Sequence, residues 1–98
     1  MTPKVIHIIT HDDYTITITF ADGITKNYDC KHLLDKGAFK ILDKLSKFHI
    51  AIIDDLGGIG WDIDDNIDSN IIWSNRIDIC KSILYQEGII VQDSILNS

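Results

Sequence analysis

The sequence predicts an α+β domain with a mostly antiparallel sheet: a three-stranded meander, a helix on one face, two further strands and a C-terminal helix. Two patterns carry this prediction. Apolar and polar residues alternate without exception in YTITITF (14–20), as they do in a half-buried strand. Apolar residues recur at helical spacing in KGAFKILDKLSK (36–47). Because strands and helices do not alternate regularly, the sheet is expected to be antiparallel.

The alternating strand leads into a hairpin, since a turn-forming Asp-Gly dipeptide follows it. A three-residue loop that ends at Gly23 pairs Phe20 with Ile24 and Ile16 with Tyr28, which keeps the apolar side chains on one face. A two-residue loop would mix the faces. We therefore expect the longer loop, with its glycine in the left-handed conformation.

A first strand is expected over 4–10, joined to the next strand by a loop over 11–13. This loop places Ile8 opposite Ile16 on the inner face. The outer face of the strand then carries three candidate interaction residues, Val5, His7 and Ile9. Because such a face is more apolar than a solvated one, we expect the C-terminal segment or a second subunit to cover it.

A helix is expected over 36–47. Asp29 can cap a short turn at CKHLL, and Asp35 can cap the helix itself. The apolar residues of the helix form one stripe that should pack on the sheet: Ala38, Phe39, Ile41, Leu42 and Leu45.

The opposite face of this helix carries a basic strip. Three lysines recur every four residues and a fourth follows one turn later: Lys36, Lys40, Lys44 and Lys47. The strip is either a solvated helix face or a docking surface for an acidic partner or a nucleic-acid backbone. Since no arginines or aromatic residues support the strip, the nucleic-acid interpretation is the weaker one.

Two more strands are expected next. FHIAIID (48–54) predicts a strand, and the glycines of DDLGGIGW predict a turn into a short strand that ends near Trp61, which should close the core. The segment GGIG (57–60) lacks the Lys-Ser/Thr of a phosphate-binding loop, so we interpret it as a hairpin turn.

The last helix is expected to begin at Asp68 or Ser69 and to end at Gly88. Its apolar stripe comprises Trp73, Ile77, Cys80 and Leu84. Residues 89–96 form either a last short strand or a partly ordered tail.

The stretch GWDIDDNIDSN (60–70) concentrates carboxylates as a calcium loop does. Such a loop needs acids or amides at its first, third and fifth positions, then a Gly and finally a bidentate Glu. The first three positions are satisfied, but Ile67 and Trp73 occupy the other two. We therefore interpret the stretch as a solvated turn whose acids are candidate contacts for a basic partner: Asp62, Asp64 and Asp65.

Zinc and thiol chemistry are not predicted. Cys30 and His32 are close in the sequence, but His49 and Cys80 are distant and no metal-ligand spacing links them. Cys30 could act as a nucleophile only with a third group to orient its partner, and none can be assigned. We therefore expect no catalytic residue, no cofactor and no metal.

The composition is that of one domain over residues 1–98, with 45% hydrophobic and 24% charged residues. The net charge of −6 opposes non-specific attraction to nucleic acid or anionic lipid. Because the N-terminus has no signal-peptide pattern and no apolar run approaches the length of a membrane span, we expect a cytoplasmic protein without membrane contact. Its two cysteines should be reduced.

The order of four stretches resembles the bacterial family known as domain of unknown function 2442: YTITITFADGITKNYD (14–29), LLDKGAFKIL (33–42), KFHIAIIDDLGGIGW (47–61) and NIDSNIIW (66–73). The resemblance covers residues 4–73 and leaves 74–98 as an added helix and tail. The chain departs from the family in the acidic loop, where members often have Trp-Pro and Gly. The resemblance implies a small α+β module without established catalytic residues, often encoded beside another small protein in pairs that look like toxin-antitoxin systems.

Two functions follow as hypotheses. The first is a non-enzymatic protein-interaction module, the antitoxin-like or regulatory member of a two-gene pair, whose partners are the neighbouring gene product and, as a homodimer, a second copy. The alternative is a nucleic-acid-binding accessory protein that uses the lysine strip. A small enzyme ranks third, and it would require a cleft that holds at least two of four features: His32, His49, Cys30 and the acidic loop.

Overall fold

The computed structural model describes residues 1–64, 66–67 and 75–91, and within them it confirms an α+β fold with antiparallel strand pairing. Four strands form sheet A in the order β1-β2-β3-β7: β1 (Val5–Thr10), β2 (Thr15–Phe20), β3 (Thr25–Asp29) and β7 (Ile89–Ile90). Three strands form sheet B in the order β4-β5-β6: β4 (Ile52–Ile53), β5 (Ile59–Asp62) and β6 (Arg76–Ile79).

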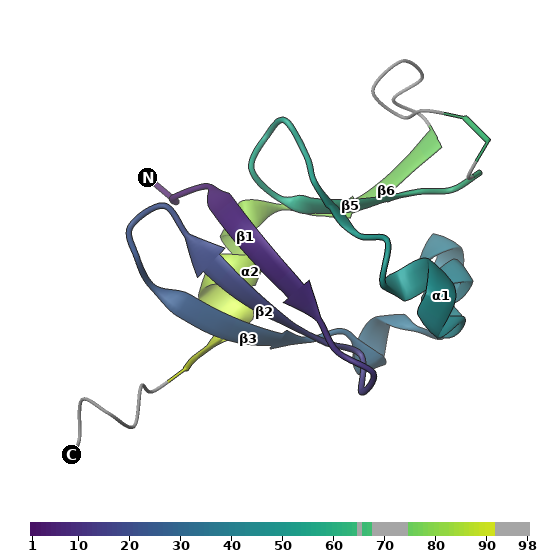
Figure 1. Ribbon diagram of the computed structural model, residues 1–98, viewed down its shortest axis with the longest axis horizontal. Helices are drawn as coiled ribbons and strands as arrows, with labels where there is room; N and C mark the ends of the chain where they lie inside the picture. The colour runs from purple at the N-terminus through teal and green to yellow at the C-terminus, as the bar shows by residue number, and fades with distance from the viewer. Residues whose placement is uncertain (65, 68–74, 92–98) are drawn as a thin grey trace.

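Short helices complete the fold: the 3-10 helices η1 (Lys31–Leu33) and η2 (Gly37–Asp43), and the α-helices α1 (Leu45–Phe48) and α2 (Lys81–Glu87). Figure 1 shows α2 against sheet A, whereas α1 lies at the opposite end of the long axis. The expected single sheet is therefore two sheets, with a hydrophobic core shared between them.

Three hairpins close through the same kind of three-residue loop, whose last residue has a positive φ: Tyr14 (66°), Gly23 (88°) and Gly57 (87°). In each loop the amide of that residue donates to the carbonyl three residues earlier. The predicted loop at Gly23 is confirmed, with Phe20 bonded to Ile24 and Ile16 paired with Tyr28. The hairpin predicted at GGIG is confirmed as well.

The predicted register of the first hairpin is wrong by two residues, because Ile8 pairs with Ile18 and not with Ile16. The loop is shifted because Tyr14 adopts a left-handed conformation, which is rare for a bulky side chain. Its ring packs at 5.1 Å from that of Phe48 and its hydroxyl donates to the Asp43 carbonyl, so tertiary contacts hold it there.

The predicted outer face of β1 is partly wrong, because the strand has a β-bulge between Val5 and His7. His7 and Ile9 lie opposite threonines on the outer face, as predicted. Val5, also expected there, instead pairs with Phe20 and is only 4% exposed, because the extra residue of the bulge turns its side chain into the core.

The continuous helix expected over 36–47 is wrong: η2 ends at Asp43, Lys44 is extended, and α1 follows. Leu42 and Phe48 are both fully buried. Six residues apart on one α-helix, they would point about 120° away from each other, so the break lets both reach the core. Asp29 accepts the Lys31 amide as predicted, but η2 begins after an extended Lys36 with no side-chain cap recorded there, so the cap predicted at residue 35 is not observed.

The predicted stripe over 38–45 is only partly buried. Leu42 is in the core and three others pack against it: Phe39, Ile41 and Leu45. Ala38 is exposed, contrary to prediction. The strand expected over 48–54 is confined to β4, while the strand near Trp61 is confirmed as β5.

The last helix is shorter than predicted, because residues 76–79 form β6 and α2 begins only at Lys81. Ile77 and Ile79 are buried on either side of an exposed Asp78, which is the alternation of a strand. Cys80 is consequently exposed and not part of an apolar stripe. Leu84 is buried and Gly88 ends the helix, both as predicted.

At the C-terminus, residues 89 and 90 form a strand, β7, and not a tail. The predicted helix start at Asp68 or Ser69, its member Trp73, and residues 92–96 lie outside the described residues.

The core is centred on Trp61, as expected. Its side chain is fully buried and stacks 6.1 Å from the ring of Phe48, while its indole Nε1 donates to the Phe48 carbonyl at 3.0 Å. Twelve other apolar side chains share this core: Val5, Ile16, Ile18, Phe20, Tyr28, Cys30, Leu42, Phe48, Ile59, Ile77, Ile79 and Leu84. The chain therefore needs no disulfide, and both cysteines are free thiols.

Gly57 joins the two sheets. Its carbonyl accepts the amide of Val5 at 2.9 Å, and a Cβ added to it would lie 2.5 Å from Cγ of Lys4. Gly57→Ala should lower the free energy of unfolding by about 2–4 kcal/mol through backbone strain and overpacking. Gly23→Ala is the matched control, because Gly23 has the same φ and open space around it. Urea denaturation should give a clearly smaller loss for the control, and equal losses would contradict the proposed close approach.

Candidate interaction surface and pocket

The segment 49–57 lies beside β1, the outer strand of sheet A. Hydrogen bonds join the two at both ends: Val5 N to Gly57 O at 2.9 Å, and Thr10 Oγ1 to His49 Nδ1 at 2.7 Å. Five large apolar side chains along this seam are 38% to 72% exposed: Ile6, Ile9, Ile50, Ile53 and Leu56. We call them the seam patch.

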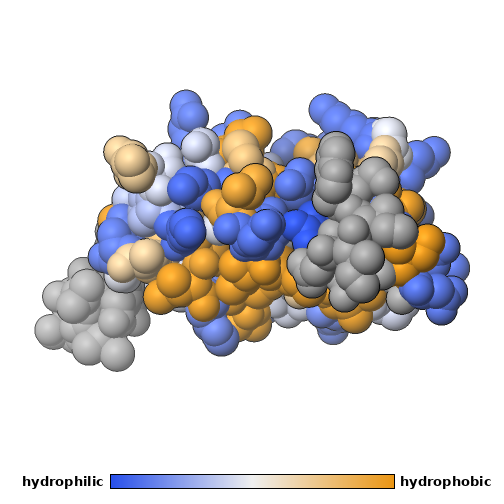
Figure 2. Space-filling model, turned by 90° about the horizontal axis from the view of Figure 1, so that it is seen from above, coloured by the Kyte–Doolittle hydropathy of each residue, from blue (hydrophilic) through white to orange (hydrophobic). Residues whose placement is uncertain are grey.

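Seen from above, the molecule has a broad hydrophobic area between hydrophilic ones (Figure 2). An exposed apolar surface of this kind is typical of a protein-interaction site. Of the outer-face residues predicted for this role, Ile9 belongs to the seam patch, His7 is exposed next to it on β1, and Val5 is excluded by its burial.

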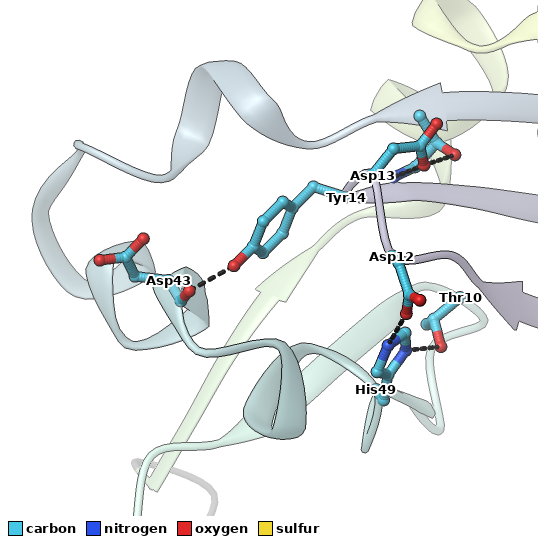
Figure 3. Close-up of polar contacts among 7 residues, drawn as sticks. Thr10, Asp12, Asp13, Tyr14, Asp43 and His49 are labelled. Atoms are coloured by element: carbon cyan, nitrogen blue, oxygen red, sulfur yellow. Dashed lines mark hydrogen bonds and ion pairs between the residues drawn. The ribbon is translucent and has the colours of Figure 1, made fainter.

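A polar cluster closes one end of the seam (Figure 3). His49 Nδ1 contacts Thr10 Oγ1 at 2.7 Å, and its Nε2 contacts Asp12 Oδ1 at 2.8 Å. This order of hydroxyl, imidazole and carboxylate is that of a nucleophilic triad. However, the Asp12 side chain is 87% exposed, so water screens its charge. We interpret the cluster as a lock between the β1–β2 hairpin and the end of α1.

The sequence did not indicate this cluster, because its three residues are common types at no motif spacing. Only the register of the first hairpin and the position of α1 bring them together.

The sequence did not indicate a role for Asn75 either. Its side-chain amide organises the acidic loop: its Oδ1 accepts the Asp64 amide at 2.8 Å, and its Nδ2 donates to the carbonyls of Asp64 and Ile67 at 3.0 and 2.6 Å.

The acids of that loop differ in environment. Asp62 was expected to stay in water but is half-buried at the end of β5, and among the described residues its buried Oδ1 has no hydrogen-bond partner. Asp64 is exposed, as predicted, and Asp65 lies outside the described residues. Within the described ranges, no three His, Cys, Asp or Glu side chains are grouped to hold a metal ion.

The lysines do not form the predicted strip. Positions four apart in a 3-10 helix differ by about 120° in direction, so the period of four does not align them along η2. Instead Lys40, Lys44 and Lys47 line a hollow of about 700 Å³ together with Asp43 and Ile63, whereas Lys36 is not in its lining. Lys47 Nζ donates to the Ile63 carbonyl at 3.4 Å.

A second hollow, of about 520 Å³, lies between η1, β6 and α2, and His32 and Cys80 both line it. Cys30 is buried outside its lining, and desolvation, followed by the charge of Asp29, raises the pKa of its thiol to about 12. Cys30 is therefore a poor nucleophile. His49 belongs to the seam cluster, so the hollow does not unite the residues that an enzyme would require.

Two buried groups predict how stability depends on pH. Burial, and then the charge of Glu87, raises the pKa of Tyr28 to about 12 from 10.0, and that of Cys30 rises from 9.0 to about 12. Because both folded pKa values exceed the unfolded ones, their stabilising contribution is complete below pH 9.0 and is lost as pH rises towards about 12.

Urea denaturation across that range should show a falling free energy of unfolding, with a shallower fall in Cys30→Ala.

A thiol reagent added to the native protein at neutral pH should modify Cys80 alone, because Cys80 is exposed and Cys30 is buried. Equal reactivity of both thiols would contradict the burial of Cys30.

Comparison with known proteins identifies a family for this chain. The family described as "Protein of unknown function (DUF2442)" matches residues 5–89. The match therefore continues beyond residue 73, the expected end of the family resemblance, and includes β6 and α2. No curated protein and no solved structure gives a significant match. In the part of the chain that the structure describes, no helix has the length and apolar character needed to cross a membrane.

Proposed function

The chain belongs to the DUF2442 family, and from this premise we propose that it is a non-enzymatic protein-interaction module, the antitoxin-like or regulatory member of a two-gene pair. The seam patch carries this proposal. It exposes five large apolar side chains at a place where the two sheets meet. Burying such side chains in an interface yields about 25 cal/mol for each Å² of apolar surface removed from water.

The position of the patch supports a protein as its occupant. Ile6 and Ile9 come from β1 and the other three side chains come from residues 49–57, so a partner can pack across both segments. The net charge of −6, together with the exposed Asp64, favours a partner with a basic surface. The occupant that we propose is the neighbouring gene product.

An enzymatic role has less support. The Thr10, His49 and Asp12 cluster is exposed to water, and the second hollow combines His32 with Cys80 but not with a buried base. A general base or nucleophile needs a partner group that activates it, and water screens the charge of the exposed Asp12.

Co-purification tests the proposal. The tagged chain, expressed with the neighbouring gene product, should retain it through washing and should alter its toxicity. Failure of the two proteins to bind, or to affect each other's toxicity, would contradict the proposal. A homodimer of this chain, measured by light scattering without the neighbour, would replace the proposed partner with a second copy.

The lysine hollow favours a second candidate, the binding of a nucleic-acid backbone. Lys40, Lys44 and Lys47 gather there, but Asp43 lines it too and the net charge opposes binding. If this function holds, the chain should retard DNA or RNA in a gel at low salt, and replacing the three lysines with Gln should abolish the shift. Absence of any shift at low salt would exclude it.

A further inference from the structure

The second hollow, which lies between η1, β6 and α2, is lined by aromatic, aliphatic and acidic side chains. Five elements contribute to it, together with Cys80, which directly precedes α2: Tyr28 from β3, His32 and Leu33 from η1, Phe39 from η2, Asp78 and Ile79 from β6, and Ile83 and Glu87 from α2. Its volume of about 520 Å³ falls within the range of small-molecule sites in proteins. It shares no residue with the seam patch, although Asp78 and Cys80 also line a smaller hollow that includes Leu56.

The walls are aromatic and aliphatic. Tyr28 and His32 are arranged edge to face with their ring centroids 5.9 Å apart, and Phe39 packs on the core from η2. Ile83 is 41% exposed on α2, which leaves an apolar surface in contact with water at the mouth. These walls can hold an apolar body of moderate size, and the aromatic faces attract a cation.

The charges of the hollow have one sign. Asp78 and Glu87 are its acidic groups, and no Lys or Arg occurs among the described residues that line it. Glu87 lines the hollow together with Tyr28, and its charge contributes to raising the pKa of Tyr28. The other titratable groups that line the hollow are the His32 imidazole, the Cys80 thiol and the Tyr28 hydroxyl.

We propose that this pocket binds a small organic cation, an amine or quaternary ammonium with an aromatic or branched aliphatic body. The body lies against Tyr28, Phe39 and Ile83, and the charged nitrogen lies towards Asp78 and Glu87. Such a ligand fits both the apolar walls and the acidic groups of the pocket. An anion would be repelled by the carboxylates, and a hydrated inorganic cation would make no use of the apolar walls. This inference does not rest on the proposed partner function.

Cys80 gives a direct readout, because it lines the pocket and is exposed while Cys30 is buried. The full chain is treated with iodoacetamide in the presence of benzyltrimethylammonium, phenylacetate or benzyl alcohol, which share an aromatic body and differ in charge. The cation should slow alkylation of Cys80 in a saturable way, and the other two compounds should protect much less.

Two variants locate the charge. Glu87→Gln with Asp78→Asn should weaken protection by the cation about tenfold, because the variant removes both carboxylates that attract the charged nitrogen. Asp35→Asn, an exposed acid outside the lining, is the matched control and should leave protection nearly unchanged. Equal protection by cation, anion and neutral compound, no saturable protection by any of them, or an unchanged affinity in the double variant would overturn the proposal. Circular dichroism of each variant verifies that it is folded.

Discussion

Trp61→Ala should lower the free energy of unfolding by about 3–5 kcal/mol, the largest stability effect expected for this chain. The indole is fully buried between the two sheets, and its removal leaves a cavity against Phe48 and the core side chains of β6. It also removes the hydrogen bond to the Phe48 carbonyl, which would be left without that donor in a buried place. Since a small domain is stable by about 5–15 kcal/mol, the variant should be close to unfolding.

Chemical denaturation followed by circular dichroism measures this loss. Trp61→Phe retains an aromatic ring but not the Nε1 donor, so its loss should be clearly smaller. Leu56→Ala is the control, because its side chain is 72% exposed and its truncation should change stability by less than about 0.5 kcal/mol. A loss below about 1 kcal/mol for Trp61→Ala would contradict the central place of Trp61 in the core.

Ile9→Lys combined with Leu56→Lys should weaken partner binding at least about tenfold and leave the fold intact. Two lysines in the seam patch would have to lose their hydration when a partner packs on it, which costs more than about 1.4 kcal/mol, the equivalent of tenfold in affinity. Both positions are exposed in the free chain, so the melting temperature should change little.

The control for this variant is Ile89→Lys, which places a lysine at an apolar position on β7 that is at least as exposed as either of the two and lies outside the seam patch. Titration calorimetry against the neighbouring gene product measures the affinity of each. Loss of binding in the control as well would indicate a general charge effect and would contradict the location of the interface.

The features that could be predicted from the sequence depend on neighbouring residues. The β2–β3 hairpin follows from strict alternation and a glycine at the loop position that needs a positive φ, both of which are local. The β1–β2 register could not be predicted, because the residue in the same loop position is Tyr14, and only its packing on the distant Phe48 holds it in that conformation.

The helical predictions failed where the helical spacing of apolar residues was not the arrangement that buries them in the core. Ile77 and Leu84 fit a helical stripe, yet Ile77 and Ile79 also fit a strand, and the adjacent edge of β5 decides in favour of the strand. In the same way, the sequence over 36–47 has a helical period but must bury both Leu42 and Phe48. The candidate surfaces were predicted only in part: Ile9 and the lysines were identified, but the seam patch depends on the contact of β1 with residues 49–57.

Sedimentation velocity tests most directly whether the seam patch is a protein-binding surface. The wild-type chain and the Ile9→Lys, Leu56→Lys variant are each run alone and mixed with the neighbouring gene product. If the patch is such a surface, the wild-type mixture should sediment as a complex, whereas the mixture with the folded variant should sediment as separate components. A variant that forms the complex as well as the wild type, or a wild-type chain that forms none, would contradict it.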